Sequence, residues 1–362
     1  MNTHTLPEPA PLRLADLVRD GSDALHAHYG NRLTHEHRHA LRAILGCRSG
    51  AYGGRALDCP DCGYQQLSLR SCGHRNCPQC QHHTASAWLD RQQAKLLPVP
   101  YFMVTFTLPE GLRALAAQQP TTVYHALFSA AAATLQRFAR NHRHLQGETG
   151  FSAVLHTHSR RLDYHPHLHV VVPAGVIDPL RRQWRTLKGR YLFNARHLAT
   201  VFRAKLLDAL NRAGIELPTA LPRRWVAHCA RVGNGLPALQ YLSRYLYRGV
   251  IQERQLLDYD RDNRTVTFRY QDGKTKRTAY RTMGLIEFLW QILQHVLPKG
   301  FRRARDFGFL HANAKRSLAL LQCVLRVTIT SSPPPTARAF RCPCCGAAMT
   351  LRCFVPPPPR VT

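Results

Sequence analysis

The chain has 362 residues, with 50 lysine and arginine residues against 21 aspartate and glutamate residues and a formal net charge of +29 at pH 7. Such an excess excludes an ordinary enzyme of small molecules and indicates a polyanionic partner. No apolar run approaches the roughly 18 residues that a membrane span requires, and the first residues do not read as a signal peptide, so we expect nucleic acid and no membrane. The 12 cysteines favour zinc in a reducing compartment over disulfides.

Helices and cysteine-rich turns are predicted for residues 1–98, which we expect to form an N-terminal helical and zinc-binding domain. Apolar periodicity favours helix over 12–45 and again over 85–97, before Pro98. Between these two regions lies a short segment, 50–80, rich in glycine and cysteine.

A strand over 101–108, stopped by Pro109, opens a second domain that we expect to extend over 99–260. The elements that follow in it are a helix over 120–142, strands over 151–155 and 167–172, a helix over 195–213, a strand over 224–232 and a helix over 236–248.

A basic C-terminal region is expected over 261–330. It contains a strand over 265–270 and an amphipathic helix over 283–296. From 331 to 362 the chain is a Pro-rich, Cys-containing tail.

The most informative segment places two histidines on one face of a strand. Alternate residues of a strand point to the same side, so His167 and His169 project together while Leu168 faces the other way. A hairpin with the preceding strand brings His156 beside the pair. Three imidazoles on one sheet face predict a metal site with open coordination positions. The alternative is that one or two of these histidines are core or surface residues.

The cysteines come in spaced pairs. Cys59-x-x-Cys62 and Cys77-x-x-Cys80 each present two thiolates, and we expect all four to bind one structural zinc ion rather than to stay unliganded. The remaining ligands nearby are enough for a second ion: Cys47, Cys72, His74 and His82. The tail offers one complete and one incomplete pair for a further zinc: Cys342, Cys344, Cys345 and Cys353.

Two tyrosines lie four residues apart on the predicted helix over 236–248. Tyr241 and Tyr245 therefore share a face, and Arg244 and Arg248 repeat at the same spacing on a neighbouring face, suited to phosphates. A tyrosine pair at helical spacing is by itself more often core packing. Beside a metal site and a large positive charge, it indicates a nuclease. There, the metal neutralises charge on the scissile phosphate and a tyrosine attacks to form a phosphotyrosine intermediate.

Several further motifs occur in one order over 41–325. They are the Cys47–Cys80 region, Phe106-Thr107-Leu108-Pro109, Leu155-His156-Thr157, His165-Pro166-His167-Leu168-His169, Tyr241-Leu242-Ser243-Arg244-Tyr245 and His295–Phe301. In these motifs the chain resembles the rolling-circle transposases of the insertion-sequence-91 family, which are HUH (His-hydrophobic-His) endonucleases. Tyr247 stands where the family commonly has His or Lys, so it is a rival candidate for the nucleophile.

The resemblance implies an α+β fold. It consists of a ferredoxin-like HUH antiparallel sheet with helices on one face, preceded by a small zinc-binding domain and followed by a helical, basic C-terminal region. The resemblance also implies Mg²⁺ or Mn²⁺ on His167, His169 and a third ligand, for which His156 is our candidate. Imidazole ligands alone suit zinc better, so the residues do not fix the metal.

The resemblance further implies that Tyr241 and Tyr245 attack single-stranded DNA at the transposon ends and the target site, leaving 5′-phosphotyrosine and a free 3′-OH. Clustered basic residues are expected to bind this DNA. The candidates are Arg244, Arg248, Arg277, Lys299, Arg302 and Arg303.

We therefore expect a cytoplasmic, nucleoid-associated bacterial transposase that nicks and rejoins single-stranded DNA. Two alternatives stay open. A plasmid relaxase or replication initiator shares the same chemistry. A zinc-dependent DNA-binding protein without cleavage would use the tyrosines only for packing.

Overall fold

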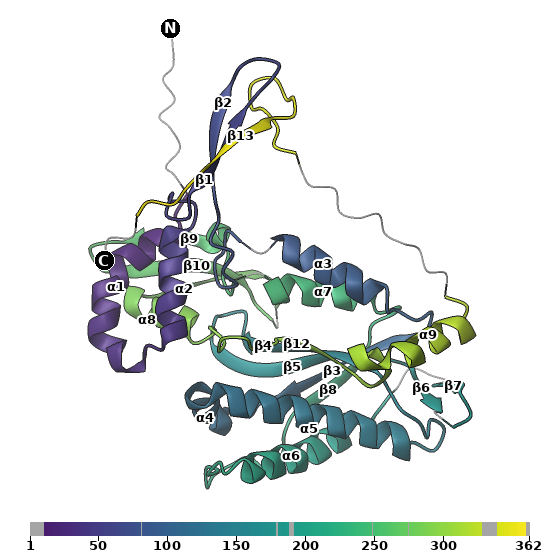
Figure 1. The fold of residues 1–362 in the computed structure, drawn as a ribbon. Helices are drawn as coiled ribbons and strands as arrows, with labels where there is room; N and C mark the ends of the chain where they lie inside the picture. The colour runs from purple at the N-terminus through teal and green to yellow at the C-terminus, as the bar shows by residue number, and fades with distance from the viewer. Residues whose placement is uncertain are drawn as a thin grey trace.

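The computed structural model of the chain is built around a five-stranded antiparallel sheet with the strand order β12-β4-β5-β3-β8 (Figure 1). Its strands are β3 (Tyr101–Thr107), β4 (Phe151–His158), β5 (Tyr164–Pro173), β8 (Ala227–Arg231) and β12 (Ala304–Phe307). The structure describes residues 11–80, 82–178, 180–187, 192–247, 249–273, 275–327 and 339–359, with the backbone alone at 82–84 and 247. The predicted α+β class with an antiparallel sheet is confirmed.

The strands β4 and β5 form the hairpin expected from the spacing of the histidines. In this pairing His156 lies opposite His167, and the next position that faces the same way brings Val154 opposite His169. β3 pairs with the other side of β5, where Thr105 lies opposite His169. The register of the ladder therefore sets all three histidines on one face of the sheet.

Helices cover the opposite face of the sheet (Figure 1). They are α4 (Arg113–Gln118), α5 (Pro120–Asn141) and α6 (Ala195–Arg212). Alternation along β3 turns Phe102, Val104 and Phe106 toward these helices, and the Phe106 ring lies 4.6 Å from that of Phe202 between centroids. The side chain of Asn194 caps the N-terminus of α6. This buried layer supports the sheet beneath the histidines.

A second helical layer, beyond the one that the sequence predicted, covers part of the histidine face (Figure 1). It consists of α3 (His82–Gln93) and α7 (Leu236–Tyr247), with α9 (Lys315–Val324) and the hairpin of β6 (Gly175–Asp178) and β7 (Gln183–Thr186) at its end. Leu239 and Leu242 of α7 belong to one buried cluster with Val154 and Val171 of the sheet. This packing fixes α7 above the histidines.

The predicted helical region over 12–45 forms two helices, because a short turn at Gly30–Arg32 ends the first and Thr34 caps the second. The helices pack with α8 and a second antiparallel sheet of order β11-β10-β9. The bounds are α1 (Leu14–Tyr29), α2 (His35–Gly46), α8 (Leu285–Leu293), β9 (Leu256–Asp260), β10 (Thr265–Gln271) and β11 (Thr278–Gly284). Leu17 and Phe288 share one core, so the packing crosses the domain boundaries that the sequence suggested.

A third sheet stands out from the body of the molecule and pairs strands from the N-terminal and C-terminal parts of the chain (Figure 1). Its order is β13-β1-β2, and its strands are β1 (Gly54–Asp58), β2 (Gln65–Leu69) and β13 (Thr350–Val355). Residues 328–338, which precede the C-terminal segment, lie outside the described residues.

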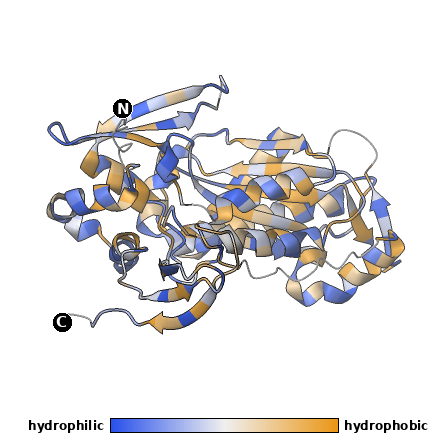
Figure 2. Cartoon of the chain, turned by 90° about the horizontal axis from the view of Figure 1, so that it is seen from above, coloured by the Kyte–Doolittle hydropathy of each residue, from blue (hydrophilic) through white to orange (hydrophobic). Residues whose placement is uncertain are grey.

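Hydrophobic residues are concentrated in the strands at the centre of the molecule, whereas the surrounding helices alternate between hydrophilic and hydrophobic residues (Figure 2). None of the helices in the described ranges is both long enough and apolar enough to span a membrane.

Candidate active site

Three imidazoles converge on the sheet face beneath α7. One ring nitrogen from each of His156, His167 and His169 lies within 4.8 Å of the other two. The Nε2 atoms of His167 and His169 are 3.2 Å apart, and the His156 ring centroid lies 4.5 Å from that of His169. The structure thus brings together the three histidines that the sequence predicts as metal ligands.

Hydrogen bonds to Nδ1 orient two of these rings. Nδ1 of His167 lies 2.7 Å from the carbonyl oxygen of His165, to which it donates, and Nδ1 of His169 lies 2.9 Å from Oγ1 of Thr105. Such bonds fix a ligand ring and leave its Nε2 free for a metal ion. Nε2 of His156 is buried and has no hydrogen-bond partner among the described residues. A buried polar atom without a partner is costly, so a cation between the three nitrogens fits the site.

The surroundings keep the imidazoles neutral. Burial lowers the pKa of His167 to about 4 and that of His169 to about 3. Burial, followed by the charges of the neighbouring histidines, holds the pKa of His156 well below its ordinary value. Because the neutral imidazole is the form that binds metal, the three rings are in a form that can bind a cation at neutral pH.

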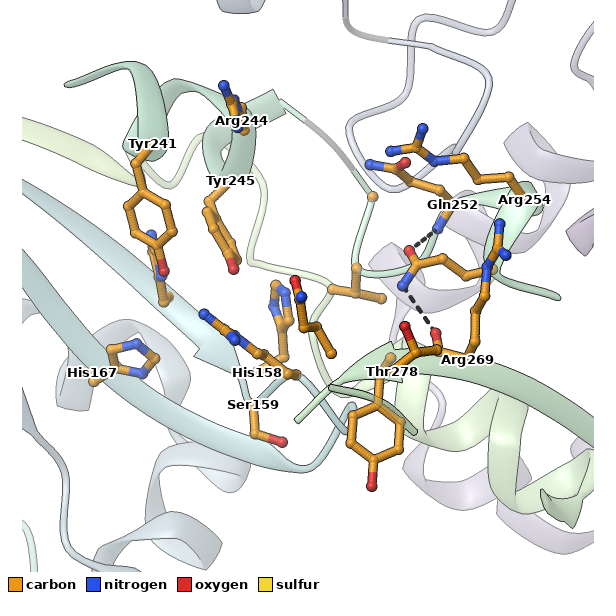
Figure 3. Close-up of a pocket in the computed structure, with 17 residues that line it drawn as sticks. His158, Ser159, His167, Tyr241, Arg244, Tyr245, Gln252, Arg254, Arg269 and Thr278 are labelled. Carbon is orange, nitrogen blue, oxygen red and sulfur yellow. Dashed lines mark hydrogen bonds between the residues drawn. The ribbon is translucent and has the colours of Figure 1, made fainter. Parts of the chain in front are cut away.

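Tyr241 and Tyr245 project from α7 toward the histidine face of the sheet (Figure 3). Their ring centroids are 4.8 Å apart, and the Tyr245 ring stacks on His156 with centroids 4.5 Å apart and an angle of 22°. Burial and then the adjacent Tyr245 hydroxyl raise the pKa of Tyr241 above its ordinary value. The predicted tyrosines and the predicted ligands therefore form one site. The side chain of Tyr247, the rival nucleophile, lies outside the described residues.

These side chains line a cavity of about 690 Å³ that extends from α7 to the sheet of β9, β10 and β11. Its basic lining residues are Arg160, Arg244, Arg254 and Arg269. Arg254 and Arg269 lie across the cavity from the tyrosines (Figure 3). Guanidinium groups around two phenol hydroxyls can bind a phosphodiester beside a nucleophile.

The predicted DNA-binding residues do not all lie at this cavity. Arg244 lines it, whereas Arg277 and Lys299 are exposed outside it. Arg302 is exposed at a second cavity of about 780 Å³, which also contains Arg75 and other residues of the cysteine-rich region. Arg248 lies outside the described residues.

Arg303 is buried against α7, unlike its exposed neighbour Arg302. It is only 8% exposed, and its guanidinium donates to the backbone carbonyl of Tyr245 over 3.1 Å. The positive charge therefore lies under the last turn of α7, where helix carbonyls lack partners within the helix. Arg303 also lines the second cavity, so its DNA contact stays a prediction, while its bond to the Tyr245 carbonyl gives it a structural contact with α7.

The expected grouping of Cys59, Cys62, Cys77 and Cys80 around one ion is wrong. Cys59 and Cys62 lie at the far end of the hairpin of β1 and β2, whereas Cys77 and Cys80 come after the chain has returned to the body of the protein. A strand of five residues spans about 17 Å, far more than the Zn–S distance of about 2.3 Å, so one ion cannot bind both pairs.

Cys77 and Cys80 instead gather with Cys47 and Cys72, all four sulfurs lying within 4.8 Å of one another. Sγ of Cys80 is 3.6 Å from Cys47 and 3.5 Å from Cys72, close to the S···S edge of about 3.8 Å around tetrahedral zinc. His74 is not in this cluster, and its Nδ1 accepts a hydrogen bond from the backbone of Asn76. The predicted second site therefore contains Cys77 and Cys80 in the places expected for His74 and His82.

The side chain of His82 lies outside the described residues.

Cys59 and Cys62 are grouped with Cys342 and Cys345 of the C-terminal tail, while Cys344 and Cys353 are exposed and outside this cluster.

Sequence reasoning missed the groups that orient the site. Thr105 and the carbonyl of His165 hold the rings of His169 and His167, and Arg303 bonds to the last turn of α7. Thr105 could have been found by placing the predicted strand over 101–108 beside that of His169. No local pattern links Arg303 to Tyr245, because the contact joins segments far apart in the sequence.

Comparison with known proteins gives the family. Residues 17–108 match a model described as "Transposase zinc-binding domain", and residues 150–317 match one described as "Putative transposase". A relative from Sinorhizobium fredii (strain NBRC 101917 / NGR234), "Putative transposase y4qJ", is 35% identical, with 96% of this chain and 97% of the relative covered. "Transposase for insertion sequence element IS801" from Pseudomonas savastanoi pv. phaseolicola is 29% identical over 84% of this chain and 81% of the relative.

Among solved structures, the conjugative relaxase TrwC in its metal-bound complex with oriT DNA aligns with a TM-score of 0.28 and 24% identity, covering 35% of this chain and 49% of the relaxase. The family rests on the sequence matches, which extend over nearly the whole chain and over both the cysteine-rich region and the histidine–tyrosine site. The chain belongs to the insertion-sequence-91 family of transposases.

Proposed function

We propose that this transposase nicks and rejoins single-stranded DNA at the ends of its insertion sequence through 5′-phosphotyrosine intermediates on Tyr241 and Tyr245. One observation carries the proposal: two phenol hydroxyls on one helix face three neutral imidazoles in a basic cavity. Tyrosines that served only for packing would not need metal-ligand histidines beneath them or guanidinium groups around them.

The histidine site fits a resident Mg²⁺ or Mn²⁺ ion. The partnerless Nε2 of His156 and the oriented rings of His167 and His169 would hold it. When bound, such an ion neutralises the charge that develops on the scissile phosphate. Three protein nitrogens leave coordination positions for phosphate oxygens and water, which are the ligands that a hard cation prefers.

The tyrosines supply the nucleophiles. The Oη atom of one tyrosine forms a bond to phosphorus, the bond from phosphorus to O3′ breaks, and the 3′ oxygen leaves as a hydroxyl. The phenol proton passes to water in the cavity, and water supplies the proton that the leaving 3′ oxygen takes up. The raised pKa of Tyr241 favours the protonated phenol in the resting site, so attack requires the loss of this proton.

Two nucleophiles allow strand transfer as well as cleavage. Because Tyr241 and Tyr245 are one helical turn apart, both reach the same group of imidazoles without a large movement of α7. One tyrosine can hold the 5′ end of a cleaved strand while the other cuts a second strand. The free 3′-OH then attacks a phosphotyrosine and rejoins DNA, which restores the tyrosine.

The DNA strand is proposed to run from the tyrosines along the wall formed by β10 and β11. Arg269 of β10 lies there for phosphates, with Arg254 beside it in the turn before β9, and Tyr270 lines the cavity with a ring on which a base can stack. Exposed Arg277, Lys299 and Arg302 add positive charge outside the cavity. We propose further that the ion held by Cys47, Cys72, Cys77 and Cys80 is a structural zinc and that the protein acts at the nucleoid of the cytoplasm.

The test uses a labelled single-stranded oligonucleotide from the element's end. With Mg²⁺, the wild-type protein should give a covalent adduct that survives a denaturing gel, and the double variant Tyr241→Phe/Tyr245→Phe should give none while still binding the oligonucleotide. Loss of one oxygen per ring retains the packing, so this variant separates chemistry from structure. A double variant that forms the adduct normally would overturn the assignment of the nucleophiles. DNA binding with no adduct from the wild type in Mg²⁺ or Mn²⁺ would favour a non-catalytic DNA-binding protein.

A further inference from the structure

Two cysteine turns near opposite ends of the chain have the same sequence pattern and the same conformation. Cys59-Pro60-Asp61-Cys62-Gly63 and Cys342-Pro343-Cys344-Cys345-Gly346 both read Cys-Pro-x-Cys-Gly. In the first turn the Gly63 amide donates to the Cys59 carbonyl over 3.0 Å, and in the second the Gly346 amide donates to the Cys342 carbonyl over 2.9 Å.

The match extends to the backbone around each turn. Gly63 and Gly346 have φ values of +70° and +79°, a region that favours glycine. The amide of the first cysteine of each turn then donates over 2.8 Å to a carbonyl beyond the glycine, that of Tyr64 in one case and Ala347 in the other. The two segments are therefore two copies of one local structure, each presenting a pair of thiols from a tight turn.

The two turns face each other. Sγ of Cys59 is 3.4 Å from Sγ of Cys345, and Sγ of Cys62 is 3.6 Å from Sγ of Cys342. All four sulfurs lie within 4.8 Å of one another, although the paired cysteines are 286 and 280 residues apart in the sequence. Four thiols at these distances match the S···S edge of about 3.8 Å around tetrahedral zinc.

The third sheet holds this arrangement in place but is too small to do so unaided. β13 pairs along β1, from Gly54 opposite Val355 to Asp58 opposite Thr350. The buried residues beneath the turns are few: Leu57, Cys59, Cys342 and Met349. Three short strands with so little apolar core are marginal in water unless a metal ion or another crosslink supports them.

We propose that Cys59, Cys62, Cys342 and Cys345 bind one structural zinc ion in a ribbon assembled from the two ends of the chain. This ion is separate from the one assigned to Cys47, Cys72, Cys77 and Cys80. Neither assignment rests on the proposed nicking activity. The C-terminal tail is then a required part of the zinc-binding region. A chain that lost either cysteine turn would lose the ion and the anchoring of its tail.

The first test is the zinc content of the purified full-length protein under reducing conditions. The wild type should contain two tightly bound zinc ions per chain. Cys342→Ser/Cys345→Ser should contain one, Cys59→Ser/Cys62→Ser should also contain one, and combining all four substitutions should still leave one. Cys344→Ser and Cys353→Ser are matched controls, because these cysteines lie in the same tail and outside the cluster, and each should retain two ions.

Non-additivity in this series is the sign of a shared ion. If both double variants kept two ions, or if the quadruple variant lost one more ion than either double variant, the two turns would not share a metal and the inference would be overturned. A second measurement needs no variant: full-length protein loaded with cadmium-113 should give two tetrathiolate resonances in its NMR spectrum. One such resonance alone would also overturn the inference. Neither readout uses DNA, so neither outcome tests the proposed nicking activity.

Discussion

Replacing Arg303 by methionine should loosen the nucleophile helix without weakening DNA binding. The guanidinium donates to the Tyr245 carbonyl in the last turn of α7, where it also complements the negative end of the helix dipole. A hydrogen bond from a charged group contributes about 1.5–3 kcal/mol, and methionine retains the apolar stem but not the donor. Local opening of α7 should therefore increase about 10- to 150-fold.

Hydrogen–deuterium exchange of peptides from α7 measures this opening, and a denaturing gel measures the covalent adduct. Arg303→Met should exchange faster in α7 and give less adduct, while its affinity for single-stranded DNA stays near that of the wild type. Arg302→Met is the matched control, because Arg302 is the exposed neighbour of buried Arg303. This control should leave α7 unchanged and reduce the salt dependence of binding. If Arg303→Met instead left α7 exchange unchanged and weakened binding as Arg302→Met does, the positioning role would be wrong.

Four further outcomes are expected. His167→Ala and His169→Ala should abolish the adduct and retain single-strand binding; full cleavage by both variants would remove the metal role. Thr105→Val should weaken Mn²⁺ binding, measured by calorimetry, by about 10- to 100-fold, because the His169 ring loses its partner. In the folded protein the pKa values of His167 and His169 are about 4 and 3, below the ordinary 6.5. Between these folded values and pH 6.5, the unfolded chain therefore binds more protons than the folded protein does. Thermal melts of the metal-free protein should show full stability above this window and a loss as pH falls through it, with a weaker loss in His167→Ala. The log–log dependence of single-strand affinity on salt should have a slope of about −0.7 per phosphate contacted, and a flat response would contradict a basic DNA path.

The sequence predicted the histidine hairpin and the tyrosine helix because both depend on local periodicity. Alternation along one strand places His167 beside His169, and helical spacing places Tyr241 beside Tyr245. These rules need no knowledge of distant segments. Residue identity and spacing were therefore enough to predict most of the candidate site.

What the sequence did not predict depends on which distant segments meet. The Cys-x-x-Cys spacing correctly indicated zinc-type turns, but it does not state which two turns share an ion. Pairing Cys59 with Cys345 requires β13 to cross to β1, and no local pattern specifies that crossing. The burial of Arg303 was not predicted for the same reason, because a basic residue in a basic segment is expected to be exposed until its partner, the Tyr245 carbonyl, is known.

The most direct test of the proposed chemistry is the identity of the residue that becomes attached to DNA. The adduct formed by the wild-type protein with single-stranded DNA from the element's end and Mg²⁺ can be digested with protease and nuclease and mapped by mass spectrometry. The modified peptide should carry its nucleotide on Tyr241 or Tyr245, through a 5′-phosphate. Modification of Tyr247, or of a residue outside α7, would contradict the account, because that residue and not the tyrosine pair above the histidines would then be the nucleophile.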